Sequence, residues 1–212
     1  MSKVKQPKLA LLLMAAGSSS RLGQPKQLIK IPNAELIKNT QQSLLHKQVN
    51  LMDSICAMFN AKPYCVVGCK SEAMITHLAT CTSTQPLTLI DNTQWSKGLS
   101  SSISKGVSVL SNDVSAVLVF LVDQWQLAKQ HLIALIQQWQ LQPEKIHIAS
   151  DNKDLGPPVI FPRTFFKELI ALSGDDGAKK VVNSNQKQVN TIEMPVAFID
   201  VDTPEQLKMI SK

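Results

Sequence analysis

The sequence predicts an α/β fold in which helices cover both faces of a largely parallel sheet. Short apolar runs typical of buried strands alternate with longer segments whose apolar residues have helical spacing. The chain has 212 residues, of which 44% are hydrophobic and 18% charged, enough for one domain with a sizeable core. Two polar segments follow apolar runs directly, and ligands of open α/β sheets bind beyond the carboxyl ends of the strands.

The predicted elements up to residue 150 follow from this alternation. Each strand is a short run rich in Leu, Val and Ile, and each helix is an amphipathic segment between two such runs. We expect strands at 9–14, 64–67, 87–90, 116–122 and 146–149, and helices at 34–45, 71–79, 101–110 and 129–140. The strand at 116–122 is apolar on both faces, which indicates a central position in the sheet.

The regular alternation of apolar runs and amphipathic segments ends after residue 150. Residues 151–158 are polar and rich in turn formers, and 173–177 reads as a tight loop. We expect a short strand at 159–161, a helix at 163–172, a short basic helix after 177 and a last strand at 196–201. The last helix begins at Thr203, with Pro204 at its first position and Gln206 closing a capping box.

The loop after the first strand has the composition of an anion site. Its small residues, Ala15-Ala16-Gly17-Ser18-Ser19-Ser20, let backbone N–H groups approach a ligand, and Arg21 and Lys26 follow as cations suited to phosphate oxygens. It is neither a dinucleotide-binding fingerprint, which needs three close glycines, nor a Walker A loop, because Gln27 stands where a Ser or Thr would follow the lysine. The loop therefore predicts a polyphosphate site, although a Gly/Ser turn alone is more often only a turn.

Carboxylates follow two predicted strands. Asp123 ends the central strand, and Asp200 and Asp202 end the last one, two residues apart and so on one face. A carboxylate there is costly unless it is solvated, hydrogen-bonded or bound to a cation, and two carboxylates with phosphate oxygens suit Mg²⁺. As alternatives, Asp123 caps the next turn and Asp202 is a turn residue before the helix.

Composition excludes several classes. No apolar stretch approaches the roughly 20 residues of a membrane span, and the phosphate-loop string occupies the place of a signal cleavage site, so we expect a cytoplasmic protein without a membrane partner. The net charge of +6 comes from scattered residues without a basic stripe, which argues against nucleic acid as a partner. The four cysteines lack zinc-like spacing and read as buried thiols.

The ordered motifs resemble those of the nucleotidyltransferase superfamily. The first loop is similar to its A-A-G-x-S-x-R-x-G-x-x-K string at every fixed position. Two further strings resemble one branch, the molybdenum-cofactor cytidylyltransferases of the MobA-like NTP transferase superfamily. They are Asn92-Thr93-Gln94-Trp95-Ser96-Lys97-Gly98-Leu99-Ser100-Ser101-Ser102, and the pair Gly156-Pro157-Pro158-Val159-Ile160-Phe161 with Leu172-Ser173-Gly174-Asp175-Asp176-Gly177-Ala178.

The resemblance implies a Rossmann-like three-layer α/β/α fold and one nucleotidyltransferase domain over 1–212. Its nucleotide-binding part covers about 1–125 and its acceptor-binding part about 126–212. The implied reaction moves CMP from CTP to the terminal phosphate of molybdenum-molybdopterin and releases pyrophosphate; the Ala15-Ala16 pair favours CTP over GTP. The implied nucleotide contacts are Ala15, Ala16, Gly17, Ser18, Ser19, Arg21, Lys26, Ser101 and Ser102, with Arg21 and Lys26 catalytic and Asp123 and Asp202 binding Mg²⁺.

Two departures from the family pattern leave the acceptor open. Trp125 replaces the proline that usually follows the Asp-Gln pair, and the segment after Lys26 is richer in Gln and Asn than its family equivalent. One alternative is nucleotidyl transfer to a sugar or polyol phosphate. Another is a non-catalytic nucleotide sensor, or a molybdenum-cofactor chaperone that serves a molybdoenzyme. The metal carboxylates argue against such a pure binder.

Overall fold

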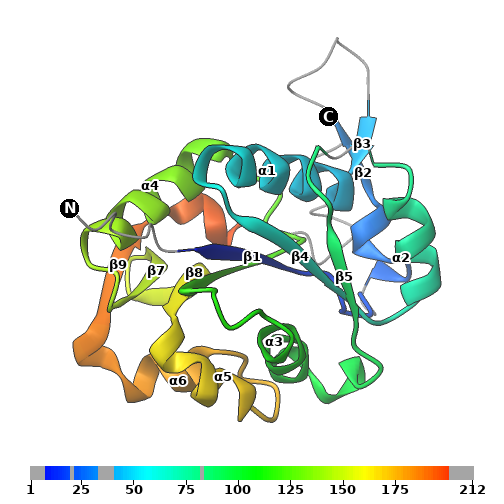
Figure 1. The fold of residues 1–212 in the computed structure, drawn as a ribbon. Coiled ribbons are helices and arrows are strands. Elements are labelled where there is room, and N and C mark those ends of the chain that lie inside the picture. The colour runs from blue at the N-terminus through cyan, green and yellow to red at the C-terminus, as the bar shows by residue number, and fades with distance from the viewer. Residues whose placement is uncertain (1–7, 20–21, 33–40, 82–83, 201–212) are drawn as a thin grey trace.

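The computed structural model describes residues 8–19, 22–32, 41–81 and 84–200. Its centre is a seven-stranded sheet with the strand order β5-β4-β1-β6-β8-β7-β9, and a short antiparallel pair, β2 and β3, forms a second sheet (Figure 1). The strands are β1 (Leu9–Met14), β2 (Lys30–Pro32), β3 (Gln41–Ser43), β4 (Lys62–Val67), β5 (Thr88–Asp91), β6 (Ala116–Leu121), β7 (Ile146–Asp151), β8 (Asp154–Pro162) and β9 (Val189–Glu193). The helices are α1 (Leu44–Phe59), α2 (Ser71–Leu78), α3 (Leu99–Ser108), α4 (Lys129–Leu141), α5 (Phe166–Ile170) and α6 (Lys179–Ser184). Short 3-10 helices are η2 (Lys26–Leu28), η3 (Trp95–Lys97), η4 (Arg163–Phe165), η5 (Gln186–Gln188) and η6 (Pro195–Phe198).

The sheet is mostly parallel, which confirms the predicted fold class. Strands β5, β4, β1 and β6 run parallel, and β9 runs parallel to β7 at the other edge. Strand β8 is antiparallel to both of its neighbours, β6 and β7. The carboxyl ends of β1 and β6 therefore meet at the same edge, where both predicted ligand segments begin.

Two hydrophobic cores lie on the two faces of the sheet. Helices α1, α2 and α4 pack on one face and α3, α5 and α6 on the other (Figure 1). Successive β1 side chains alternate between the cores: Leu11 and Leu13 join the α1 side, and Leu12 and Met14 join the α3 side. A strand between two helical layers must be apolar at every position, and each buried leucine stabilises the fold by about 1.5–3 kcal/mol.

The helix predicted at 34–45 is wrong at residues 41–43 and correct at Leu44 and Leu45. Residues Gln41–Ser43 form β3, and the helix begins at Leu44, with the Ser43 hydroxyl accepting a hydrogen bond from the His46 N–H at 3.0 Å. The predicted helix also ended too early. Buried positions such as Val49 and Met52 continue the helical spacing well beyond residue 45, although the segment is rich in Gln and Asn. Residues 33–40 lie outside the described residues.

Two predictions in the second half also need correction. The strand predicted at 196–201 is wrong where the structure describes it: Pro195–Phe198 is η6, and the edge strand is β9, whose side chains are half-exposed or exposed. An edge strand of mixed polarity lacks the apolar run used to find the others. Residues 154–158, read as turn-rich, belong to β8, which pairs with β7 through the tight connection Asp151 to Asp154. The predicted last helix lies outside the described residues.

The thiols of Cys56 and Cys65 are buried, and burial raises the pKa of each to about 12. These groups are therefore protonated at neutral pH and pack as small apolar side chains.

Among the described residues, no helix is long and apolar enough to cross a membrane.

Helix α4 begins with a pH-sensitive contact. His131 Nδ1 accepts the Ala128 N–H at 3.0 Å, and burial, together with the Lys47 charge, lowers the His131 pKa below 6.5. Because the folded state favours neutral imidazole, this contact stabilises the protein fully above pH 6.5, and the stabilisation is lost as pH falls through the lowered pKa. We expect His131→Ala to cost about 1 kcal/mol at pH 7.5 and less at pH 5. Urea unfolding of both proteins at the two pH values measures this; an equal cost at both would contradict it.

Candidate functional site

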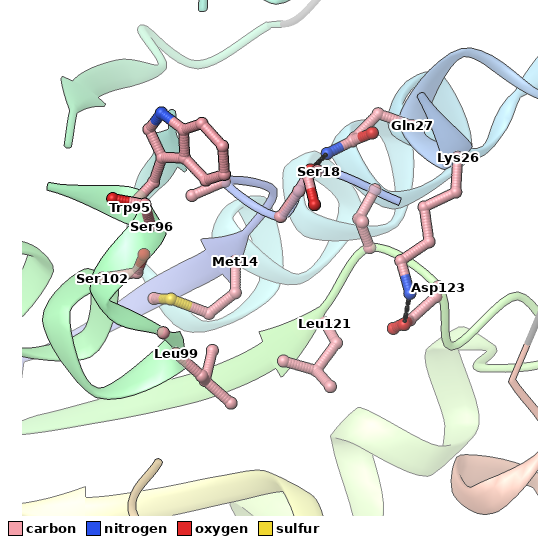
Figure 2. Close-up of a pocket in the computed structure, with 14 residues that line it drawn as sticks. Met14, Ser18, Lys26, Gln27, Trp95, Ser96, Leu99, Ser102, Leu121 and Asp123 are labelled. Atoms are coloured by element: carbon pink, nitrogen blue, oxygen red, sulfur yellow. Dashed lines mark hydrogen bonds and ion pairs between the residues drawn. The ribbon is translucent and has the colours of Figure 1, made fainter. Parts of the chain in front are cut away.

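A cavity of about 380 Å³ lies at the carboxyl ends of β1 and β6. Its walls come from three segments far apart in sequence, 14–18, 95–102 and 121–123, together with Lys26 and Gln27. Figure 2 shows Lys26 and Asp123 pointing toward one another on one side of the view, and Trp95 on the other side. The topology therefore brings the predicted phosphate loop and the predicted metal carboxylate into one cavity.

Hydrogen bonds to the backbone carbonyls hold the predicted phosphate loop in place. The oxygens of Ala15 and Gly17 accept hydrogen bonds from Gln27 Nε2 at 2.8 and 2.9 Å, and the Ala16 oxygen accepts the Cys69 N–H at 3.0 Å. In contrast, the N–H groups of Ala16, Gly17 and Ser18 donate to no acceptor in the described part of the chain. A loop with occupied carbonyls and available successive amides suits an anion.

Ala15 and Ser19, both predicted to contact phosphate, make hydrogen bonds within the protein instead. The Ala15 N–H donates to Val66 O at 2.9 Å and its side chain is buried in the α1-side core, so this amide is unavailable and must be removed from the predicted phosphate contacts. Ser19 adopts a left-handed conformation (φ 53°), and its Oγ accepts the Lys26 N–H at 3.0 Å, which closes the loop onto η2. Arg21 lies outside the described residues.

Gln27 is a site residue that the sequence analysis did not identify. It is 1% exposed, and its Nε2 supplies both hydrogen bonds to the loop carbonyls. The available signal was a carboxamide directly after the lysine, noted only because it rules out a Walker A loop. Gln27 reaches these carbonyls only because the loop folds back toward η2, and no local sequence pattern predicts this.

Lys26 and Asp123 form an ion pair inside the cavity (Figure 2). Their side chains are 16% and 11% exposed, and the second carboxylate oxygen, Asp123 Oδ1, is buried with no hydrogen-bond partner among the described residues. A buried carboxylate oxygen without a donor fits a hard divalent cation, which prefers oxygen ligands. Asp123 is therefore a suitable metal ligand; the second predicted ligand, Asp202, lies outside the described residues.

Gln124 connects the two halves of the molecule next to Asp123. Its Nε2 donates to Pro157 O at 2.6 Å and to Ala197 O at 2.8 Å, and its Oε1 accepts the Leu121 N–H at 2.9 Å. Because these groups belong to β8, η6 and β6, one buried carboxamide fixes three segments beside the cavity.

The two serines predicted as nucleotide contacts line different cavities. Asn92 Nδ2 donates to Ser101 Oγ and Ser102 Oγ, at 3.0 Å in both cases. Ser102 lines the cavity with Asp123, whereas Ser101 donates from its Oγ to Gly98 O at 2.9 Å and lines a separate cavity. The structure therefore brings Ser102, but not Ser101, to the phosphate loop.

The cavity continues toward the C-terminal half. Leu99 and Leu121 also line two neighbouring cavities of about 350 and 420 Å³, and Lys179 lines both of these. Asp200 follows η6 and lines the larger one rather than the cavity of Asp123. Trp125 does not line the cavity of Asp123. Its backbone N–H donates to Asp123 O at 2.8 Å, but the residue lines a different cavity together with residues of α1.

Gly98 joins the two later motifs at the cavity wall. It has a φ of 87°, and a Cβ added there would lie 2.0 Å from Asp175 Oδ1. Alanine thus meets backbone strain, and the exposed Asp175 carboxylate has to move away from it, so we expect Gly98→Ala to lower the free energy of unfolding by about 1–3 kcal/mol. Gly174→Ala is the matched control, because its φ is 84° but nothing lies within 4 Å of an added Cβ. Equal losses in urea unfolding would show that the Asp175 contact is unimportant.

Comparison with known proteins identifies relatives over nearly the whole chain. The purine catabolism protein PucB of Bacillus subtilis (strain 168) is 25% identical over 224 residues, covering 99% of this chain and 98% of PucB. The crystal structure of Rv0371c from Mycobacterium tuberculosis H37Rv has a TM-score of 0.72 at 24% identity, over 96% of this chain and 97% of Rv0371c. The structure of Rv0371c in complex with manganese has a TM-score of 0.67 at 22% identity, again over 96% of this chain and 97% of Rv0371c.

A third structural match is the molybdopterin-guanine dinucleotide biosynthesis protein A from Archaeoglobus fulgidus. It has a TM-score of 0.61 at 13% identity, over 95% of this chain and 96% of that protein. These structural matches show a shared fold. The family model described as the MobA-like NTP transferase domain matches residues 11–189. Because this match covers most of the chain, including the predicted phosphate loop and Asp123, the chain belongs to the MobA-like NTP transferase family.

Proposed function

We propose that this nucleotidyltransferase moves CMP from CTP to the terminal phosphate of molybdenum-molybdopterin and releases pyrophosphate. The observation that carries the proposal is the shared cavity, in which available loop amides, Lys26 and Asp123 lie together. Amides and an ammonium group suit a triphosphate, and the carboxylate suits the divalent cation that accompanies it. A pure phosphate-binding loop would have no need of Asp123.

The chemistry needs positioning and charge neutralisation rather than a covalent intermediate. The amides of Ala16, Gly17 and Ser18 hold triphosphate oxygens, and Lys26 and Arg21 neutralise their charge. Asp123, with Asp202, holds Mg²⁺, which when bound neutralises the phosphate charge that develops during transfer. An oxygen of the acceptor phosphate attacks the α-phosphorus in line, the new P–O bond forms, and the bond to the β-phosphate oxygen breaks.

The acceptor half of the cleft supports a phosphorylated acceptor. Lys179 lines both cavities that adjoin the nucleotide side, and Lys153 lines one of them. The molybdopterin in the name of the Archaeoglobus fulgidus protein favours a pterin phosphate as acceptor. The Ala15-Ala16 pair favours cytosine, since guanylyl-transferring members of the family that the motifs resemble usually carry glycines there.

The first test is pyrophosphate release from CTP and from GTP with Mg²⁺, with and without molybdenum-molybdopterin. We expect release from CTP that depends on the cofactor, and at most weak release from GTP. Methylerythritol phosphate and a sugar phosphate serve as competing acceptors. Release that depends on either of these instead would overturn the molybdopterin assignment, and faster release from GTP would overturn the base assignment.

A further inference from the structure

We propose that Lys26 is a switch that exchanges Asp123 for the nucleotide. Without nucleotide its ammonium group occupies the Asp123 carboxylate, and when a triphosphate binds, the ammonium moves to phosphate and leaves the carboxylate to a divalent cation. The inference rests on the proposed function, because it needs a nucleoside triphosphate in this cavity. It adds an order of events: metal binding at Asp123 depends on the nucleotide.

The geometry lets Lys26 change partners without moving its backbone. Its N–H is fixed to Ser19 Oγ at 3.0 Å, and the next residue, Gln27, is tied to the loop carbonyls. From this fixed point the flexible stem carries the ammonium across the cavity to Asp123 (Figure 2). Gly17 and Ser18 line the same cavity, so a phosphate held by their amides would lie within reach of this side chain.

Charge balance explains why the exchange needs the triphosphate. A carboxylate that is only 11% exposed is costly to leave without a counter-ion, and in this structure Lys26 supplies that charge. A divalent cation that arrives alone meets the ammonium at the same carboxylate and is repelled by it. A triphosphate offers the ammonium a new anionic partner, so that the cation and the ammonium each end beside a negative charge.

Thermodynamic linkage turns this exchange into a measurable coupling. If the triphosphate must release Asp123 before a cation can bind there, each ligand raises the affinity for the other by the same factor. Removing the Lys26 charge should abolish the competition. The nucleotide-free protein would then bind a divalent cation more tightly, although its affinity for nucleotide falls.

The test measures Mn²⁺ binding to the full chain without nucleotide, from the electron paramagnetic resonance signal of free Mn²⁺. We expect Lys26→Met to bind Mn²⁺ on the order of 10-fold more tightly than the wild type. Lys26→Gln also removes the charge but keeps a hydrogen-bond donor for Asp123. It should show the same gain, and it replaces the methionine variant if that protein is poorly folded. Adding Asp123→Asn to either variant should remove the gain, and the exposed control Lys105→Met should leave affinity unchanged.

Unchanged or weaker Mn²⁺ binding in both Lys26 variants would overturn the switch, as would a gain that survives Asp123→Asn. These comparisons contain no nucleotide, so they test whether Lys26 excludes a cation from Asp123, the competition that the switch requires, whichever nucleotide the protein uses. The proposed function fails separately, if the wild type binds neither CTP nor GTP in the presence of Mn²⁺.

Discussion

Asp123→Asn is expected to lower the rate of metal-dependent pyrophosphate release by on the order of 100- to 1,000-fold, with the fold intact. Asparagine keeps the size of the side chain and an oxygen that can accept from Lys26, so the 11% exposed position remains filled and partnered. It removes the negative charge and hence the attraction for a hard divalent cation. The loss should therefore fall on metal-dependent chemistry rather than on stability.

The measurement is the initial rate as a function of Mg²⁺ concentration, with CTP affinity and unfolding measured in parallel. Asp113→Asn is the matched control, because Asp113 also pairs with a lysine, Lys8, but on the exposed surface. An Asp123→Asn rate with wild-type Mg²⁺ dependence would remove Asp123 from the metal site. A loss confined to CTP affinity would mean that the carboxylate positions Lys26 instead.

The fold was predictable where burial determines the sequence. Strand β1 matches its prediction at both ends, because a strand between two helical layers is apolar at every position and the small-residue loop bounds it. The prediction was wrong where burial is partial. Strand β9 is an edge strand with a mixed pattern, and the short β3 precedes α1 without an apolar signal of its own.

The sequence predicted which residues lie together better than it predicted their contacts. Gly17, Ser18, Lys26 and Asp123 do share one cavity, as the positions of the strand ends suggested. Local sequence cannot reveal that the Ala15 N–H bonds to the neighbouring strand, because this hydrogen bond is to Val66, 51 residues away. The ion pair and the Gln27 contacts are likewise consequences of chain topology.

Gln27→Met is expected to disorder the phosphate loop and to weaken CTP binding by about 10- to 100-fold. Methionine fills a similar volume but offers no donor, so the carbonyls of Ala15 and Gly17 lose the Nε2 group that now lies 2.8 and 2.9 Å away. Each acceptor left without a partner costs about 1–3 kcal/mol if it stays buried. The loop can avoid this cost by turning its carbonyls toward the cavity, which withdraws the amides and presents oxygens to the phosphates.

Two measurements separate these routes. A loop that stays in place lowers the free energy of unfolding by about 2–4 kcal/mol and keeps CTP affinity, whereas a loop that turns keeps most of its stability and loses affinity. We expect mainly the second, because the loop borders a cavity and has room to move. Gln138→Met, on the exposed face of α4, controls for the substitution itself. If Gln27→Met matched the wild type in both stability and CTP affinity, the amides would be positioned by the β1 backbone alone, and Gln27 would have no part in shaping the site.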